Sequence, residues 1–282
     1  MELANPIVVK GLLARHGFHF SKSLGQNFLV DSSVCPQMAE LSGTDDAVGV
    51  LEIGPGIGVL TVELARLFPK VVAMELDQRL FPVLKETLHG FDAVHVVEGD
   101  ALKADLSELI AREFDGPVVV CANLPYYITS PLLMRLLESR LNITAITAMV
   151  QKEAGERICA EPGTRKAGAI SLAVHYYAQP QQLFDVPASS FLPRPKVDSC
   201  VIRMDVRKKP PIEVKDEKLL FRVIRAAFAQ RRKMLRGALS AGLGIAKQDL
   251  VGAFQASGVL ETKRAEQLTL AEFSALADAI GR

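Results

Sequence analysis

Residues 117–126 read Pro-Val-Val-Val-Cys-Ala-Asn-Leu-Pro-Tyr. A continuous run of β-branched and small apolar residues that ends in a turn signal predicts a strand buried on both faces, as in a parallel sheet. In an open α/β sheet, ligands bind just outside the carboxyl ends of such strands. We therefore expect Asn123, Leu124, Pro125 and Tyr126 to lie at the binding edge of the sheet.

This segment carries groups that suit an exposed planar amine. The Asn123 amide can hydrogen-bond an amino group, and Pro125 has no N–H, which leaves nearby backbone carbonyls free to accept. The Tyr126 ring offers a face on which a base can stack. By itself the segment fits equally well a polar turn whose two tyrosines close the core, so the rest of the chain has to decide between these interpretations.

Strand and helix patterns alternate on both sides of this segment. Apolar runs predict strands at residues 48–53, 71–75, 94–97, 118–122, 145–150, 170–177 and 200–204. Helical periodicity is found at residues 59–67, 130–141, 219–239, 248–257 and 270–279. In the second of these helices we predict Ser130 as the N-cap and Pro131 as the first helical residue. The alternation is typical of a doubly wound, mostly parallel α/β sheet of about seven strands.

A linker and a charge asymmetry divide the chain. Lys208-Lys209-Pro210-Pro211 interrupts the pattern. Residues 1–206 hold 18 Lys and Arg against 24 Asp and Glu, a net charge of −6, whereas residues 207–282 hold 15 against 8, a net charge of +7. We predict a Rossmann-like domain at residues 1–206 with a helical leader at 1–47. A basic helical domain that binds a polyanion is predicted at residues 207–282.

The composition describes a globular chain. Its 282 residues are 49% hydrophobic, which suffices for a large core, and the overall net charge is +1. No apolar stretch has the length needed to span a membrane, and the first residues lack a signal-peptide pattern. Four cysteines without a C-x-x-C pair indicate reduced, mostly buried thiols. We expect a soluble cytoplasmic monomer that binds no membrane and no metal.

A glycine-rich turn, Gly54-Pro55-Gly56-Ile57-Gly58, follows the first predicted strand. Glycines permit a tight turn and the close approach of a ligand to a helix N-terminus. The dinucleotide pattern G-x-G-x-x-G would have its third glycine at position 59, which is Val59. The spacing found here suits a compact, uncharged or cationic ligand better than a pyrophosphate.

Two acidic residues at successive strand ends indicate what this ligand is. Glu75 ends the second predicted strand, 21 residues after Gly54, where a carboxylate can accept both hydroxyls of a ribose. Asp100 follows the third strand, where it can accept from an adenine amino group. Either acid alone is more often a solvated charge at a strand end. Together, after a glycine loop, they favour a nucleoside cofactor.

These features resemble an S-adenosylmethionine-dependent methyltransferase of class I that acts on adenine N6. More narrowly, the chain resembles the ribosomal RNA adenine N6,N6-dimethyltransferase family that modifies the small subunit. The resemblance covers nearly the whole length, and its motifs lie at residues 23–29, 51–60, 123–133, 191–199 and 228–235. One departure is Ala167, where the family is expected to have Tyr.

The resemblance implies S-adenosylmethionine as cofactor, with S-adenosylhomocysteine as product. It implies transfer of two methyl groups to each of two adjacent adenines near the 3′ end of 16S ribosomal RNA, in naked RNA or in a pre-30S or 30S particle. This reaction would serve small-subunit biogenesis. The cofactor residues that follow from it are Asn27, Leu29, Gly54, Glu75, Asp100 and Asn123, together with Gly56 and Ala101 of the same two loops.

The expected catalytic residues are Asn123, Leu124, Pro125, Tyr126 and Phe191. The Asn123 side-chain oxygen and a carbonyl near Leu124 or Pro125 would accept hydrogen bonds from the two N–H groups of the adenine amine. These bonds favour a pyramidal and more nucleophilic nitrogen. Tyr126 would stack on one face of the flipped base and Phe191, in a loop that closes on the base, on the other. We expect Tyr127 to pack rather than to contact the base.

Six basic residues are the candidates for binding RNA phosphates: Arg222, Arg225, Arg231, Arg232, Lys233 and Arg236. They lie within about four helical turns and cannot all share one face, so some should be solvated and some should reach phosphates. Residues 207–239 as a whole hold 11 Lys and Arg against 3 Asp and Glu.

Three other functions stay open at this point. An adenine N6-methyltransferase acting on large-subunit RNA or DNA is disfavoured by the motifs at residues 191–199 and 228–235. A non-catalytic RNA-binding or assembly factor with the same fold is disfavoured because Glu75, Asn123 and Tyr126 are intact. A nicotinamide-dependent dehydrogenase is disfavoured by the glycine spacing and the lack of an obvious histidine at a hydride site.

Overall fold

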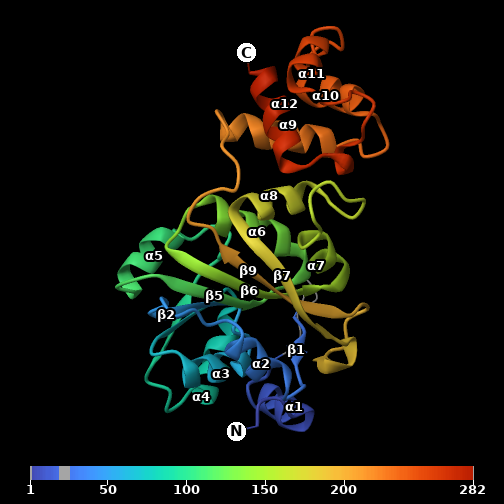
Figure 1. The fold of residues 1–282 in the computed structure, drawn as a ribbon. Coiled ribbons are helices and arrows are strands. Elements are labelled where there is room, and N and C mark those ends of the chain that lie inside the picture. Colours follow the sequence, from blue (N-terminus) through green and yellow to red (C-terminus); the bar gives the residue numbers. More distant parts are fainter. Residues whose placement is uncertain (1, 19–25, 282) are drawn as a thin grey trace. The chain divides into compact units, whose positions relative to one another are not determined.

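The computed structural model describes residues 2–18 and 26–281, which divide into two compact units (Figure 1). The first unit comprises residues 1–155 and 181–206, and the second comprises residues 156–180 and 207–282. Residues 23–25, at the start of the first predicted motif, lie outside the described residues.

A seven-stranded sheet in the order β4-β3-β2-β5-β6-β9-β7 carries the fold. Its strands are β2 (Gly49–Ile53), β3 (Val71–Glu75), β4 (Val94–Glu98), β5 (Val118–Asn123), β6 (Ile143–Gln151), β7 (Ala178–Val186) and β9 (Ser199–Val206). The five strands from β4 to β6 pair in parallel, and β9 pairs antiparallel with β6. The predicted mostly parallel α/β sheet is confirmed.

Helices cover both faces of this sheet. Figure 1 shows α2 (Val34–Glu40) and α3 (Val59–Leu67) on one side and α5 (Leu106–Glu113) and α6 (Thr129–Glu138) on the other, with α4 (Phe81–Thr87) on the side of α3. A core cluster of apolar side chains joins α2 and α3 to the central strands. Because β2 and β3 are buried along their whole length, they read as continuous apolar runs in the sequence.

The start of α6 differs from the prediction. The helix begins at Thr129, directly after the 3-10 turn η3 (Tyr126–Ile128), and Ile128 occupies the N-cap position without a side-chain hydrogen bond. Ser130 is therefore not the cap, and Pro131 is the third helical residue. Since the first N–H groups of a helix have no partner within it, proline is still tolerated there.

The leader at residues 1–47 is helical only in part. It contains α1 (Pro6–Arg15), which Asn5 caps by accepting from the Ile7 N–H at 2.9 Å, and α2. Between them, β1 (Phe28–Leu29) pairs antiparallel with β8 (Phe191–Leu192), which follows the 3-10 turn η4 (Ala188–Ser190). In this pairing Leu29 is the register partner of Phe191. The pairing therefore joins the leader to the proline-rich segment at residues 187–195.

The strand predicted at residues 170–177 is wrong, because this segment forms α8 (Ala169–Tyr177). The strand of the sheet is instead β7, which directly follows α8 and which the prediction missed. Every side chain from Ser171 to Tyr177 is buried, so the helix shows no polar stripe. A helix of this kind cannot be told from a buried strand by periodicity.

The second unit is helical. It contains α9 (Glu217–Phe228), α10 (Leu235–Leu243), α11 (Val251–Ser257), the 3-10 turn η5 (Ala265–Gln267) and α12 (Leu270–Ile280). The single helix predicted at residues 219–239 is thus two helices joined by a turn at 229–234. Asp216 caps α9 by accepting from the Leu219 N–H at 3.0 Å.

Residues 156–180 belong to the second unit, whereas the sequence-based boundary at 206 assigns them to the first. The reason lies in α8, whose Tyr176 and Tyr177 rings pack on Phe221 of α9 at centroid distances of 5.3 and 5.4 Å. Both tyrosine hydroxyls donate to the Glu217 carboxylate. In the same unit, Ala167 is fully buried.

Candidate functional site

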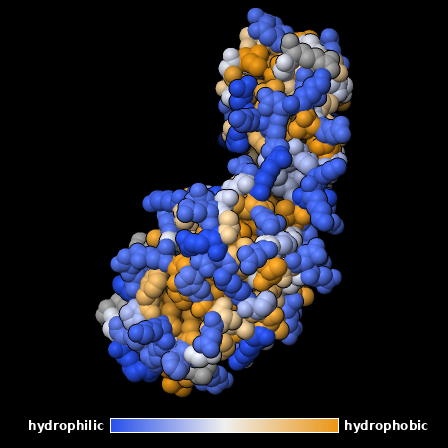
Figure 2. All heavy atoms as spheres, turned by 90° about the vertical axis from the view of Figure 1, so that its left-hand side faces the viewer, coloured by the Kyte–Doolittle hydropathy of each residue, from blue (hydrophilic) through white to orange (hydrophobic). Residues whose placement is uncertain are grey.

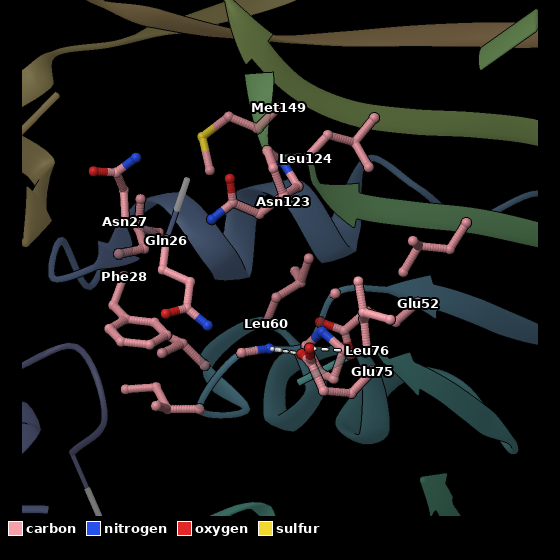
Figure 3. Close-up of a pocket in the computed structure, with 18 of the residues that line it drawn as sticks. Gln26, Asn27, Phe28, Glu52, Leu60, Glu75, Leu76, Asn123, Leu124 and Met149 are labelled. Atoms are coloured by element: carbon pink, nitrogen blue, oxygen red, sulfur yellow. Dashed lines mark hydrogen bonds between the residues drawn. The ribbon is translucent and has the colours of Figure 1, made fainter. Parts of the chain in front are cut away.

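One pocket at the carboxyl ends of the parallel strands brings the predicted residues together (Figure 3). It is lined by every residue predicted for cofactor binding or catalysis: Asn27, Leu29, Gly54, Gly56, Glu75, Asp100, Ala101, Asn123, Leu124, Pro125, Tyr126 and Phe191. These residues come from positions 27 to 191 of the chain. Those from Gly54 to Tyr126 meet because parallel strands end at the same edge of a sheet, and Asn27, Leu29 and Phe191 are supplied by the separate β1–β8 pair and the residue directly before it.

The glycine loop after β2 forms one wall of this pocket. Gly56 has a φ of 61°, in the left-handed region that favours glycine, and its N–H donates to Glu75 Oε2 at 3.2 Å. A Cβ atom at Gly56 would lie 3.2 Å from the Phe28 ring. The loop therefore requires glycine here both for its backbone angle and for the close contact with Phe28.

Glu75, the last residue of β3, is held in one orientation by the backbone. Its Oε1 accepts from the N–H groups of Leu76 at 2.9 Å and Asp77 at 2.8 Å, and its Oε2 accepts from Gly56. Burial raises the pKa of this carboxyl, whereas the three N–H donors favour its charged form. A carboxylate has about four lone-pair sites, so Glu75 keeps acceptor capacity for a ligand.

Asp100 and Ala101 follow β4 on the neighbouring wall. Asp100 Oδ1 accepts from the Leu102 N–H at 2.9 Å, and Asp100 Oδ2 lies 3.3 Å from Lys103 Nζ. The first contact fixes the turn and leaves the second oxygen as the one that a ligand can use. Ala101 is buried and completes the apolar part of this wall.

The segment after β5 offers two acceptors to the pocket. The Leu124 N–H donates to the Met149 carbonyl at 3.3 Å, and the Pro125 carbonyl accepts from the Ile128 N–H at 3.1 Å. Within the part of the chain that the structure describes, no donor reaches the Leu124 carbonyl or the Asn123 side-chain oxygen. Of the two carbonyls considered from the sequence, that of Leu124 is therefore the one available to an amine.

The Tyr126 ring is fixed by a residue that lies two strands away in the sheet order. Its hydroxyl lies 2.8 Å from Ser199 Oγ at the start of β9, and burial raises its pKa. Ser199 is the last residue of the motif at residues 191–199. The motif thus supports the segment Asn123–Tyr126 through this contact, besides contributing Phe191 to the pocket.

A network of side chains holds the N-terminal segment against the pocket. Gln26 Nε2 donates to Asp77 Oδ2 at 2.7 Å, and Arg79 donates to both oxygens of Asp77. The Arg79 guanidinium also lies over the Phe18 ring, 5.0 Å from its centroid, and Phe18 contacts Phe28. In Figure 3, Gln26, Asn27 and Phe28 lie together on one side of the cavity.

Phe191 differs from its expected setting. Its side chain is 4% exposed and belongs to the core cluster while it borders the pocket. Because β8 pairs with β1, the ring is a fixed part of the wall in this structure rather than part of an open loop.

Glu52, which is not among the predicted site residues, lines the pocket as well. It is 1% exposed, and its Oε2 has no hydrogen-bond partner among the described residues. Burial raises the pKa of Glu52 to about 8; the Glu75 carboxylate adds to this rise and the Thr61 hydroxyl opposes it. A lone acid inside an otherwise apolar strand was the signal that could have identified it.

Tyr127 is the second difference from expectation. It was expected to pack, but its side chain is 58% exposed at the pocket. The neighbouring turn residue Ile128 lines the pocket as well and is partly buried.

The six basic candidates lie on two elements and the turn between them. Arg222 and Arg225 are exposed on α9, and Arg231, Arg232 and Lys233 are exposed in the turn before α10. Arg236 instead pairs with Glu261 at 2.9 Å. None of the other five has a carboxylate within ion-pair distance in the described structure. Hydrophilic side chains cover much of the second unit at the top of Figure 2.

All four cysteines are free thiols, and three of them are buried, as predicted. Among the described residues, no group of three or more His, Cys, Asp or Glu side chains is arranged to hold a metal ion. The helices of the described chain include none with the length and apolar character required to cross a bilayer.

Known proteins share both this sequence and this fold. A family model for ribosomal RNA adenine dimethylase matches residues 17–281. The ribosomal RNA small subunit methyltransferase A of Geobacillus thermodenitrificans is 45% identical over 99% of this chain and 97% of its own length. That of Bacillus licheniformis is 42% identical over 98% of this chain and 97% of its own length.

Two solved structures show the same architecture at 25% identity. A dimethyladenosine transferase from Plasmodium falciparum matches with a TM-score of 0.71 over 88% of this chain and 95% of that chain. The 23S rRNA methyltransferase ErmE matches with a TM-score of 0.68 over 90% of this chain and the whole of that one. By sequence over almost its full length, the chain belongs to the ribosomal RNA adenine dimethylase family of methyltransferases.

Proposed function

We propose that this chain dimethylates N6 of two adjacent adenines near the 3′ end of small-subunit ribosomal RNA, with S-adenosylmethionine as methyl donor. The observation that carries the proposal is the single pocket in which Asn123–Tyr126 faces the glycine loop and Glu75. The relatives that are 42–45% identical are named for the small ribosomal subunit. These names favour small-subunit RNA as the substrate over the 23S RNA in the name of ErmE.

The pocket fits this cofactor. Glu75 has acceptor capacity for ribose hydroxyls, and Asp100 has an oxygen for an adenine amino group. The buried Oε2 of Glu52 has no hydrogen-bond donor among the described residues. An ammonium or sulfonium ligand, or a water bound to that ligand, would complement this oxygen. When bound, S-adenosylmethionine supplies an electrophilic methyl group.

The chain's own residues position the nucleophile. The Asn123 oxygen and the Leu124 carbonyl accept hydrogen bonds from the two N–H groups of the target amine. These bonds draw the nitrogen lone pair out of the ring and toward the methyl donor. Tyr126 holds one face of the flipped base, with Phe191 as the candidate for the other. No base is required before attack, because the nitrogen becomes acidic once it carries a positive charge.

We predict that Glu75→Ala weakens S-adenosylmethionine binding by about 1–3 kcal/mol, as expected for loss of hydrogen bonds to a charged group. Calorimetric titration measures this change. Glu98→Ala is the matched control, since Glu98 also ends a strand but is exposed and does not line the pocket. Unchanged cofactor affinity in the Glu75 variant would remove this residue from the site.

The exposed basic residues of the second unit are proposed to bind RNA phosphates. Residues 156–180 add three basic and two acidic side chains to the charges of residues 207–282, so this unit carries a net charge of +8. The turn at 229–234 presents Arg231, Arg232 and Lys233 without competing carboxylates in the described structure. A polyanion is the partner that such a surface favours.

Neutralising Arg231, Arg232 and Lys233 together is expected to lower RNA affinity. Three phosphate contacts to single-stranded RNA contribute about 2 to the slope of log affinity against log salt, so the slope should fall by that amount. RNA anisotropy titrations at several salt concentrations measure it, and cofactor affinity should not change.

A triple variant of exposed basic residues in the first unit, Arg66, Lys85 and Arg112, is the control for total charge. If both triple variants keep the wild-type slope, the charges of the turn only solvate the second unit. RNA recognition would then be assigned to residues 1–30 and the region around Phe191.

Mass spectrometry of ribosomal RNA tests the proposal as a whole. Naked 16S RNA, pre-30S particles, large-subunit RNA and DNA are each incubated with the chain and isotopically labelled S-adenosylmethionine. We expect two labelled methyl groups on each of two adjacent adenines near the 3′ end. We also propose that the chain acts as a monomer in the cytoplasm, where ribosomal subunits assemble. Label found only on large-subunit RNA or DNA, or nowhere, contradicts the proposal.

A further inference from the structure

Tyr127 is the single aromatic residue among the large hydrophobic side chains that are exposed in the described structure. Its exposed fraction is 58%, and it borders the pocket four positions after Asn123. The catalytic arrangement described above does not use it. An aromatic ring that remains open to water beside a pocket for a base is available to a second base.

The local backbone holds this ring away from the pocket interior. Tyr126 and Tyr127 are consecutive residues of η3, and a 3-10 helix has three residues per turn, so their side chains point about 120° apart. The hydroxyl of Tyr126 is fixed on Ser199, whereas no residue of the described structure hydrogen-bonds Tyr127. The turn is framed by Pro125, with a φ of −55°, and by the buried Thr129, which begins α6.

The substrate leaves a base in need of such a platform. When one adenine leaves the stack to enter the pocket, its neighbour loses a stacking partner and lies next to the pocket mouth. Aromatic rings accept the face of any base, and stacking on one strengthens binding roughly 5- to 150-fold. Leu76 is also exposed at this pocket, at 49%, but an aliphatic side chain offers no flat face.

We propose that Tyr127 is a stacking site for the nucleotide adjacent to the target adenine in single-stranded RNA. The inference rests on the proposed function and adds a second base subsite to it. Because the two target adenines are neighbours, the base on Tyr127 is the other target while the first one reacts. The subsite therefore holds the second target base beside the pocket while the first one reacts.

A tryptophan reporter tests this directly, since the chain contains no Trp. In Tyr127→Trp, a short RNA with two adjacent adenines should cause a loss of tryptophan emission as the indole stacks. An abasic site in place of the second adenine should abolish that loss. Leu67→Trp is the control, because Leu67 is 54% exposed at the far end of α3 and its reporter should not respond.

Anisotropy of labelled RNA, measured on the same samples, separates two kinds of failure. Binding of RNA to Tyr127→Trp with unchanged tryptophan emission, or a loss of emission that the abasic RNA also causes, overturns the stacking site and leaves the proposed function intact. Absence of RNA binding and methyl transfer in the wild-type protein overturns the proposed function, and the stacking site falls with it.

Kinetics give an independent measurement. Tyr127→Ala should raise KM for RNA by roughly 5- to 150-fold with kcat and cofactor affinity nearly unchanged, because the lost contact lies outside the reacting atoms. Tyr127→Phe keeps the ring and should retain the wild-type KM. Equal KM values for the Ala and Phe variants contradict the proposal.

Discussion

Asn123→Ala is expected to lower the rate of methyl transfer by about 10²–10³-fold at saturating RNA and cofactor, the loss typical of removing one hydrogen-bonding group that acts on the transition state. The structure places this amide at the end of β5 with its oxygen free of donors from the described residues. Its bond to adenine N6 matters most as the nitrogen becomes tetrahedral, so RNA affinity should change far less than turnover.

Single-turnover kinetics with preformed RNA complexes measure this loss without a contribution from binding. Asn123→Asp keeps an acceptor oxygen and should retain more activity than the alanine variant. Asn142→Ala is the control, since Asn142 precedes β6 and so lies at the opposite edge of the sheet. Near-full methylation by Asn123→Ala would contradict the proposed mechanism, whatever the fold.

Much of the fold could be predicted because its sequence signals are local. Strands β2, β3 and β5 are buried, β-branched runs followed by turn residues, and the helix at 59–67 was predicted with its observed bounds. The residues at the ends of these strands then had to share one edge of the sheet. That is why residues as distant as Gly54 and Asn123 were predicted to lie together, and both line the same pocket.

Two of the elements that the prediction lacked, α8 and β7, have misleading sequence signals, for opposite reasons. The α8 helix is buried at every position from Ser171 to Tyr177, so its sequence lacks the polar stripe of a surface helix. The β7 strand contains Pro180 and several glutamines, which argue against a strand. Pro180 is tolerated because β7 is the last strand in the sheet order. On an edge strand, some N–H groups face solvent and need no partner in the sheet, so a residue without an N–H fits there.

The site residues that were missed depend on tertiary context. Glu52 is a lone acid in a strand buried at every position, which signals a buried carboxyl, but the sequence does not show that this carboxyl borders the pocket. The exposure of Tyr127 depends on the direction of the η3 turn, and the contact between Tyr126 and Ser199 joins residues 73 positions apart. Such contacts exist only once the sheet has formed.

Glu52→Gln is expected to stabilise the ligand-free protein increasingly as the pH rises from 4.5 to 8. Burial raises the pKa of Glu52 to about 8 in the folded state, whereas the unfolded chain has the ordinary value of 4.5. Between these values the folded protein keeps a proton that the unfolded chain has released. The free energy of unfolding of the wild type therefore falls by about 1.4 kcal/mol per pH unit from this residue alone.

The glutamine variant lacks this dependence, since its amide is neutral at every pH. Urea unfolding of both proteins at pH 5, 6, 7, 8, 9 and 10 should give stability curves that diverge up to pH 8 and run parallel above it, where Glu52 is ionised in both states. Glu138→Gln, which removes an exposed carboxylate at the end of α6, should not reproduce the divergence. Curves for Glu52→Gln that stay parallel to those of the wild type from pH 5 to 8 would contradict the prediction.

The same variant should bind S-adenosylmethionine more weakly, because a neutral amide replaces the group that a cationic ligand can ionise. An acid that destabilises the empty pocket and strengthens cofactor binding is expected at a functional site rather than in a structural core. Calorimetry at pH 7 on the wild type and Glu52→Gln measures this part. A variant that gains stability and keeps full cofactor affinity would show that the unpartnered oxygen of Glu52 faces the pocket without serving the ligand.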